Sequence, residues 1–298
     1  MYLAEIGGRD HARVPCKQCS DQRKKSTEPC VSVDRKGDWV VYLCQHCGDK
    51  GAFPIHEKLP KAKPQRPSFT VDISGGIRDS AKEYLAARGI SEATFTAANL
   101  FSTNYTFRTS TQEAIGFPNI LAGKCVGVKY RALNKEFSQE PGSEQVFWGQ
   151  DNVHLTSDNP TLIITEGEID TLSVREAGLN NVVSVPGGAP MQVAEGRISP
   201  SEDRKFSFVH AAKDMLDSMS KIILAVDNDE PGMALMEELA RRIGKGKCWV
   251  VTYPDGCKDL NEVLVNHGAE AVRSVIANAK PFPIHGLFGA DNYFAEVN

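Results

Sequence analysis

The chain has 298 residues, of which 41% are hydrophobic and 24% charged, a composition typical of a globular protein with one or two domains. It contains no run of about 18 apolar residues that could cross a bilayer, and its first residues lack the apolar core of a secretory signal. We therefore expect a cytoplasmic protein without membrane contacts. The net charge of −4 divides into +4 over residues 1–64 and −8 over residues 65–298. A basic N-terminal part is compatible with nucleic-acid binding, and an acidic remainder is compatible with metal binding. The alternative is a chance fluctuation of charge along the chain.

The first 53 residues contain two Cys-x-x-Cys pairs, Cys16–Cys19 and Cys44–Cys47, separated by 24 residues. Clustered cysteines in a reducing compartment indicate metal ligation, and two such pairs complete a tetrahedral site for one structural zinc ion. Redox-active or simply buried cysteines are the alternative. The stretch CVSVDRKGDWVVYLC predicts a hairpin that turns at 36–38, so residues 1–53 read as a zinc ribbon. Cys30 is either a spare thiol or a substitute ligand.

Residues 54–68 contain four prolines and several basic residues, which predicts an extended linker. A basic subdomain over residues 69–155 follows, with a helix over 77–90 and strands over 125–133 and 145–149. Basic side chains gather in this subdomain. Lys124 and Arg131 are candidates for binding nucleic acid, and Lys129 and Lys135 lie close to them in the sequence.

Residues 156–280 alternate short apolar strands with helices. The strands are predicted over 161–165, 181–185, 221–226 and 248–253, and the helices over 168–178, 208–219, 232–243 and 260–268. This alternation predicts an α/β subdomain with a mainly parallel sheet covered on both faces. Ligands of such sheets bind beyond the carboxyl ends of the strands. The remaining residues, 281–298, form a tail or a linker.

Carboxylates follow three of these strands. Glu166 directly follows the first strand, Asp227 and Asp229 follow the third, and Asp259 follows the fourth after a short loop. Because the ends of parallel strands meet at one edge, their oxygens should converge as ligands for magnesium. Asp170 is a further candidate ligand, and Glu168 is either a supporting group or a favourable charge at a helix N-terminus. The alternative for each acid is a solvated surface carboxylate.

The stretches TEGEIDTLS and AVDNDEPG resemble the Toprim domain shared by primases, topoisomerases and certain nucleases. With ARGIS, GVKYRALNKEF, VVSVPGGA and CKDLNE behind a four-cysteine ribbon, residues 12–280 resemble the primase half of bifunctional bacteriophage primase-helicases. The resemblance implies a zinc-binding domain that helps to select the template, joined to an RNA polymerase domain. Carried over by motif, the metal-binding acids are Glu166, Asp227, Asp229 and Asp259, and the basic catalytic positions that handle nucleotide phosphates are Lys129 and Lys135.

The resemblance implies a DNA primase, which makes short RNA primers on single-stranded DNA with one or two Mg²⁺ ions, or Mn²⁺ in their place. The implied partners are the template, nucleoside triphosphates, a replicative helicase and a DNA polymerase, in the bacterial host cytoplasm for a phage protein. No Gly-x-x-x-x-Gly-Lys-Ser/Thr loop occurs, so a helicase motor would belong to a longer chain or a separate protein. Two stretches, between the cysteine pairs and between PGGAP and KIILAV, are longer than expected, which leaves the template preference open.

Two other functions remain open on the sequence alone. A Toprim strand-cleaving enzyme, either a topoisomerase or a nuclease, is the first; a topoisomerase needs a tyrosine nucleophile, and no motif marks one of the seven tyrosines. A non-catalytic recombination mediator is the second. Such a protein needs no intact acid set, whereas this chain keeps Glu166, Asp227 and Asp229 together.

Overall fold

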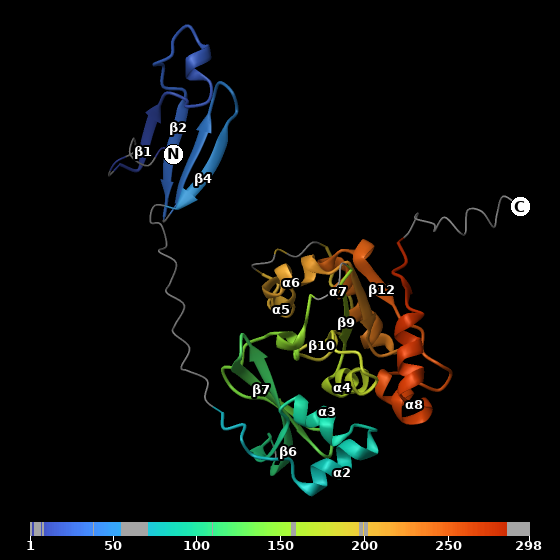
Figure 1. Cartoon of the computed structure of the whole chain (residues 1–298). Coiled ribbons are helices and arrows are strands. Elements are labelled where there is room, and N and C mark those ends of the chain that lie inside the picture. Colours follow the sequence, from blue (N-terminus) through green and yellow to red (C-terminus); the bar gives the residue numbers. More distant parts are fainter. Residues whose placement is uncertain are drawn as a thin grey trace, which may run out of the picture. The chain divides into compact units, whose positions relative to one another are not determined.

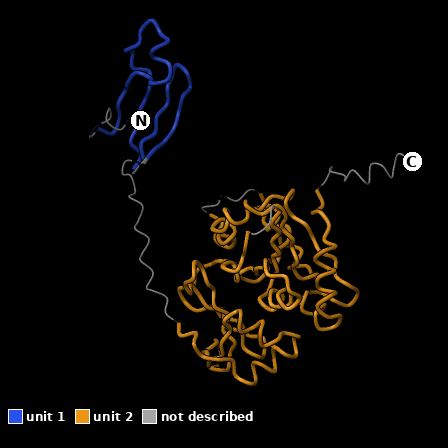
Figure 2. The backbone as a smooth tube through the Cα atoms, viewed as in Figure 1, with its two compact units in different colours: residues 1–66 blue, residues 67–298 orange. Residues whose placement is uncertain are grey.

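The computed structural model describes residues 2, 7, 9–37, 39–54, 71–108, 110–155, 159–196, 199 and 202–284. The chain divides into two compact units, Met1–Arg66 and Pro67–Asn298 (Figure 2). The expected linker at 54–68 and tail at 281–298 fall almost wholly outside the described residues, so both stay expectations.

The smaller unit is a single antiparallel sheet. Its strands, in spatial and chain order, are β1 (His11–Val14), β2 (Val31–Lys36), β3 (Trp39–Cys44) and β4 (Lys50–Pro54), with a short turn of helix, η1 (Ser20–Gln22), after β1. The predicted hairpin is confirmed, because Lys36 pairs with Trp39 and Gly37 takes a left-handed φ of 61°. Asp38, expected in the same turn, lies outside the described residues. Few apolar side chains are buried here, so the core alone is small.

The larger unit begins with a helical pair and a second antiparallel sheet. Helices α2 (Asp79–Ala87) and α3 (Glu92–Ala97) precede strands β5 (Phe101–Thr106), β6 (Thr111–Leu121), β7 (Lys124–Ala132) and β8 (Phe137–Gln139), which pair in that order. The helix predicted over 77–90 and the strand predicted over 125–133 are confirmed as α2 and β7. The strand predicted over 145–149 is wrong: Trp148 makes only an isolated bridge to Ser184, and the chain then turns at Gly149 into η2 (Gln150–Asn152).

A five-stranded sheet forms the rest of the larger unit (Figure 1). Its spatial order is β10 (Val182–Ser184), β9 (Thr161–Thr165), β11 (Lys221–Ala225), β12 (Cys248–Val250) and β13 (Lys280–Pro281). The first four strands are parallel and β13 is antiparallel, which confirms the predicted mainly parallel sheet.

Helices α4 (Glu168–Glu176), α7 (Glu230–Ile243) and α8 (Leu260–Ala277) confirm three predicted helices, with η3 (Lys245–Lys247) between α7 and β12. The helix predicted over 208–219 is instead two short helices, α5 (Ser207–Ala211) and α6 (Lys213–Ser218). α8 extends beyond the predicted end, because the chain resumes helical geometry after a kink at Gly268, where φ is 80°.

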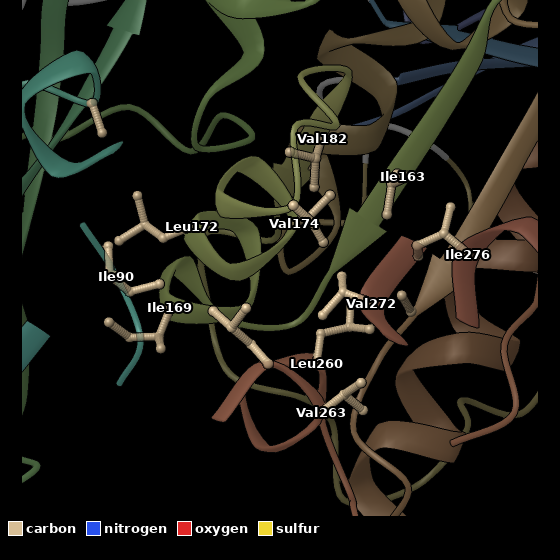
Figure 3. Close-up of a cluster of buried hydrophobic side chains, with 14 of the residues drawn as sticks. Ile90, Ile163, Ile169, Leu172, Val174, Val182, Leu260, Val263, Val272 and Ile276 are labelled. Atoms are coloured by element: carbon tan, nitrogen blue, oxygen red, sulfur yellow. The ribbon is translucent and has the colours of Figure 1, made fainter. Parts of the chain in front are cut away.

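Alternate residues of the buried strands point to opposite faces of the sheet and build two cores. On one face, Ile163 and Ile223 pack with α4 and α8; on the other, Leu162 and Ile164 pack with α5, α6 and α7. Figure 3 shows side chains of the first core converging from α4, α8, β9 and β10, together with Ile90. Since this core includes residues of α2 and α3, the basic subdomain and the parallel sheet share one hydrophobic interior, which fixes the cleft between them.

Candidate metal centre and active site

The four predicted zinc ligands come together in the smaller unit. The Sγ atoms of Cys16, Cys19, Cys44 and Cys47 all lie within 4.8 Å of one another. Burial opposes ionisation of Cys44, but backbone N–H groups of Cys47 and His46 point at its sulfur and lower its pKa to about 6. Because thiolates are the ligand form of cysteine, four closely spaced sulfurs with such donors fit a structural zinc ion.

The fifth cysteine of the ribbon, Cys30, is outside this group of four. Its Sγ atom nevertheless lies 3.7 Å from Cys44 Sγ. Cys30 therefore has a neighbour in space that its isolated place in the sequence does not reveal, and it packs against the edge of the cluster.

The acidic residues lie at the carboxyl edge of the parallel sheet, beside a cleft of about 550 Å³ in the larger unit. Glu166 follows β9 and Asp227 follows β11, and β9 and β11 are adjacent strands. Asp170 on α4 and Asp259 before α8 line the same cleft. Asp229 is not among the lining residues, although its charge acts on Glu166.

The carboxylates of the cleft repel one another strongly. Burial, followed by the charge of Asp229, raises the pKa of Glu166, and its buried Oε2 atom has no hydrogen-bond partner among the described residues. Burial, then Glu166 and Asp259, raises the pKa of Asp227 to about 7. Burial and the Asp259 charge raise the pKa of Asp170 well above its ordinary value. A divalent cation among these oxygens would relieve both the desolvation and the repulsion.

Two of the predicted magnesium ligands also cap helices. Asp229 Oδ1 accepts from the Gly232 N–H at 2.9 Å and caps α7. Asp259 Oδ1 accepts from the Glu262 N–H at 2.7 Å and caps α8. Capping is a structural role for these acids that sequence reasoning did not weigh, and it occupies one oxygen of each. Within the described residues, only the ribbon cysteines bring three or more potential ligand atoms within 4.8 Å of one another, so the acids are spaced more widely.

Basic side chains line the cleft together with these acids. Lys129 Nζ donates to Glu168 Oε1 at 2.8 Å in a largely buried ion pair, which assigns Glu168 a role as the partner of a lysine. Lys135 lies exposed in the β7–β8 turn with a left-handed φ of 72°, and the Arg131 guanidinium lies 5.5 Å from the centre of the Tyr84 ring and 4.8 Å from that of Phe137. These three basic residues line the cleft, whereas Lys124 does not.

Sequence reasoning missed Arg88 and Lys258 as residues of the cleft. Both residues lie within motifs of the resemblance, ARGIS and CKDLNE. A basic residue in a motif does not by itself predict where its side chain points. Asn261 positions Arg88: its side chain accepts from Arg88 Nη1 at 2.9 Å and donates to the Arg88 carbonyl at 2.8 Å. The backbone N–H of Asn261 donates to Asp170 Oδ1 at 3.1 Å, so one buried residue joins the end of α2 to the acidic edge.

Gly232→Ala should destabilise the larger unit by about 2 kcal/mol, because overpacking a tight site forces backbone shifts. A β-carbon at this position would lie 2.0 Å from the Asp227 carbonyl oxygen, which cannot move without displacing Asp227 itself. Thermal unfolding of the intact chain measures the loss. Gly246→Ala is the matched control, since its β-carbon would meet nothing within 4 Å. Equal unfolding temperatures for the two variants would show that the loop after β11 accommodates the methyl group.

In magnesium-free buffer above about pH 7.5, Asp227→Asn should stabilise the larger unit by about 1 to 2 kcal/mol. The folded-state pKa of Asp227 is about 7, whereas an exposed aspartate in the unfolded chain titrates near about 3.9. Between these values the folded chain binds more protons than the unfolded chain, so stability falls as the pH rises through this window, and the loss is complete above the folded pKa. Asparagine removes that loss.

The advantage of the asparagine variant should therefore shrink as the pH is lowered toward about 4. Thermal unfolding across this range measures it, with exposed Asp255→Asn as the control. An Asp227→Asn chain that is less stable than the parent at the alkaline end would show that the carboxylate makes a stabilising contact.

Comparison with known proteins agrees with this architecture. A Toprim-like family model matches residues 163–264. The chain is 36% identical over 283 residues to a primase homolog protein of Arabidopsis thaliana, covering 90% of this chain and 81% of that protein. It is 34% identical to the Arabidopsis Twinkle homolog protein, chloroplastic/mitochondrial, and 30% identical to the DNA helicase/primase of Enterobacteria phage T3. It covers 42% and 45% of those two proteins, and they cover 97% and 93% of this chain.

Solved structures show the same fold. The primase fragment of the bacteriophage T7 primase-helicase superposes with a TM-score of 0.51 at 23% identity, covering 89% of this chain and 98% of that chain. The zinc-binding and RNA polymerase domains of Aquifex aeolicus primase give a TM-score of 0.52 at 14% identity, covering 94% and 83%. A ribbon with four clustered thiols, followed by a Toprim-like sheet, is the architecture of Toprim-type primases.

This chain belongs to the primase family that includes the Arabidopsis primase homolog. The predicted fold class, a zinc-ribbon-like unit with an α/β Toprim core, and the resemblance to phage primase-helicases are both confirmed. Among the described residues, no helix is both long and apolar enough to cross a membrane.

Proposed function

We propose that this chain is a DNA primase that synthesises short RNA primers on single-stranded DNA by template-directed nucleotidyl transfer. One observation supports it above the others: in a chain of the primase family, Glu166 and Asp227 meet at adjacent parallel strand ends, beside a cleft that Lys135 and Arg131 also line. A bacteriophage T7 structure, 28% identical with a TM-score of 0.51, contains primase domains bound to an RNA/DNA hybrid and dTTP. The aligned region covers 66% of this chain and 91% of the T7 chain.

Glu166 and Asp227 would hold one or two magnesium ions, which Mn²⁺ could replace, with Asp170, Asp229 and Asp259 as further candidates. The buried Oε2 atom of Glu166, which has no hydrogen-bond partner in the described part of the chain, fits such an ion. Bound magnesium would lower the pKa of the attacking hydroxyl and neutralise charge on the transferred phosphorus. We assign these roles to magnesium because its preferred ligands are hard oxygens such as those of carboxylates.

The side chains of the cleft orient the reactants. Lys135 and Arg131 neutralise triphosphate oxygens, and Lys129, set in its ion pair with Glu168, adds a third positive charge on that side. The 3′-oxygen of one nucleotide forms a bond to the α-phosphorus of the next. The bond from that phosphorus to the pyrophosphate oxygen breaks, and the hydroxyl proton passes to water.

The zinc ion, the domain division, the partners and the compartment are part of the same proposal. The ribbon holds one structural Zn²⁺ and helps to select the template. We propose that the chain divides into a ribbon (1–53), a linker (54–68), a basic subdomain (69–155), a Toprim subdomain (156–280) and a tail (281–298). A replicative helicase and a DNA polymerase are the proposed partners, because the T3 relative is a helicase/primase and the T7 complex contains a lagging-strand DNA polymerase. The cytoplasm is the proposed compartment, although one Arabidopsis relative is described as chloroplastic/mitochondrial.

Primer synthesis on a library of random single-stranded DNA tests the function. Labelled ribonucleotides are supplied with magnesium, and the products are sequenced with their templates. We expect short RNA complementary to the template, enriched at a preferred start sequence. Cleavage or relaxation of DNA without nucleotides would support the strand-cleaving enzyme instead, and magnesium-independent DNA binding without incorporation would support the recombination mediator.

A further inference from the structure

A second cavity, of about 190 Å³, lies in the larger unit, and none of the described residues that line it also lines the active-site cleft. Pro118 and buried Trp148 contribute its apolar wall, and exposed Asn99, Asp151 and Asn152 contribute polar groups. Its volume is several times the roughly 30 Å³ that one water molecule occupies in the liquid. The cavity can therefore hold a small ligand.

The basic group of this cavity is Arg175, near the end of α4. Its guanidinium lies over the Trp148 ring, 5.1 Å from the ring centroid. Its Nη2 atom is buried and has no hydrogen-bond acceptor among the described residues, and none of their charges acts as its partner. A β-carbon at Gly149 would lie 2.3 Å from Nη2, so the glycine leaves the space in which the guanidinium sits.

Apart from the Trp148 ring, this cation has no electrostatic partner in the described part of the chain. Burial lowers the pKa of Arg175 to about 10, and an unpaired buried charge costs free energy that a partner would restore. Asp151, the acid of the cavity, does not serve as that partner. Its two oxygens accept the backbone N–H groups of Ala122 and Gly123, at 2.6 and 2.9 Å, and so hold the β6–β7 turn.

We infer that this cavity is a binding site for a small oxyanion, a phosphate or carboxylate group, held by Arg175 with the amides of Asn99 and Asn152 at its rim. The guanidinium suits both chemistries, because its N–H groups donate charge-assisted hydrogen bonds to either group. The site is separate from the active-site cleft, so the inference does not depend on the proposed primase activity.

Thermal unfolding of the full chain in magnesium-free buffer at constant ionic strength tests the site. Inorganic phosphate and sodium acetate are the two probes, and their separate titrations distinguish a phosphate site from a carboxylate site. At ten times its Kd, the preferred anion should raise the unfolding temperature of the larger unit by about 3 to 6 °C. Arg175→Gln should abolish that shift, and Lys135→Ala, which alters the other cleft, should preserve it.

The stability of the variants without anion provides an independent readout. Arg175→Gln should be at least as stable as the parent chain, because it removes a buried charge that has no ion-pair partner among the described residues. If this variant does not fold, the cavity arginine has a structural role and the inference is wrong. Asn152→Ala, at the exposed rim, should weaken anion binding several-fold without loss of stability. No shift with either anion, an equal shift in Arg175→Gln, or a shift lost in Lys135→Ala would each overturn the site.

Discussion

Replacing Asp227 with asparagine should reduce primer synthesis by about 10³-fold, the equivalent of several kcal/mol of transition-state charge stabilisation. The carboxylate follows β11, and burial, together with the nearby charges of Glu166 and Asp259, raises its pKa to about 7. An amide keeps the shape of the side chain but has lost the negative charge that would bind a divalent cation. Labelled dinucleotide formation on a defined template measures the loss.

The same variant separates a chemical defect from a folding defect. Because Asp227→Asn is expected to be more stable than the parent chain without magnesium, low activity would accompany a higher unfolding temperature. Asp255→Asn, an exposed acid on the loop after β12, is the matched control and should retain normal synthesis. Near-normal synthesis by Asp227→Asn would show that the Asp227 carboxylate is not needed for catalysis.

Removing zinc should unfold the smaller unit while the larger unit stays folded. The ribbon buries few apolar side chains, and the cysteines are part of its core. Metal binding supplies about 10 to 16 kcal/mol of apparent free energy in small zinc domains, more than such a core provides. The two units are separately compact, so the loss should not spread.

Amide hydrogen exchange read by mass spectrometry, before and after chelation, measures this effect. Protection should disappear over β2 and β3 and remain over β9 and β11. Cys16→Ser should reproduce the result without a chelator, while Cys125→Ser, in β7, should leave ribbon protection intact. A ribbon that keeps its protection once its zinc content has fallen to zero would show that the sheet is stable without metal.

The parallel sheet could be predicted from the sequence because its signals are local. Short apolar runs alternate with amphipathic stretches, and the acids stand directly after the runs. The segment 145–149 was predicted wrongly for a related reason: its apolar residues pack into the interior, but Trp148 has only one bridging partner, Ser184. Apolar composition reports burial, and burial alone does not determine strand pairing.

The site could be predicted only in part, since side-chain direction depends on distant contacts. Glu166 and Asp227 were predictable because strand ends in a parallel sheet share an edge. The capping roles of Asp229 and Asp259 could have been predicted, since each aspartate directly precedes a helix. Both were interpreted only as magnesium ligands, because they also follow strand ends. Arg88 enters the cleft through Asn261, 173 residues later, and no local pattern records that pairing.

A crystal structure of the chain with Mn²⁺ and a ribonucleoside triphosphate is the most direct test of the shared carboxylate edge. Anomalous scattering locates manganese without reference to the protein. We expect at least one manganese peak with oxygens of both Glu166 and Asp227 at about 2.0 to 2.3 Å, the distance typical of small hard divalent cations. Manganese bound elsewhere on the chain, with these two carboxylates left without a cation while the triphosphate occupies the cleft, would contradict the account.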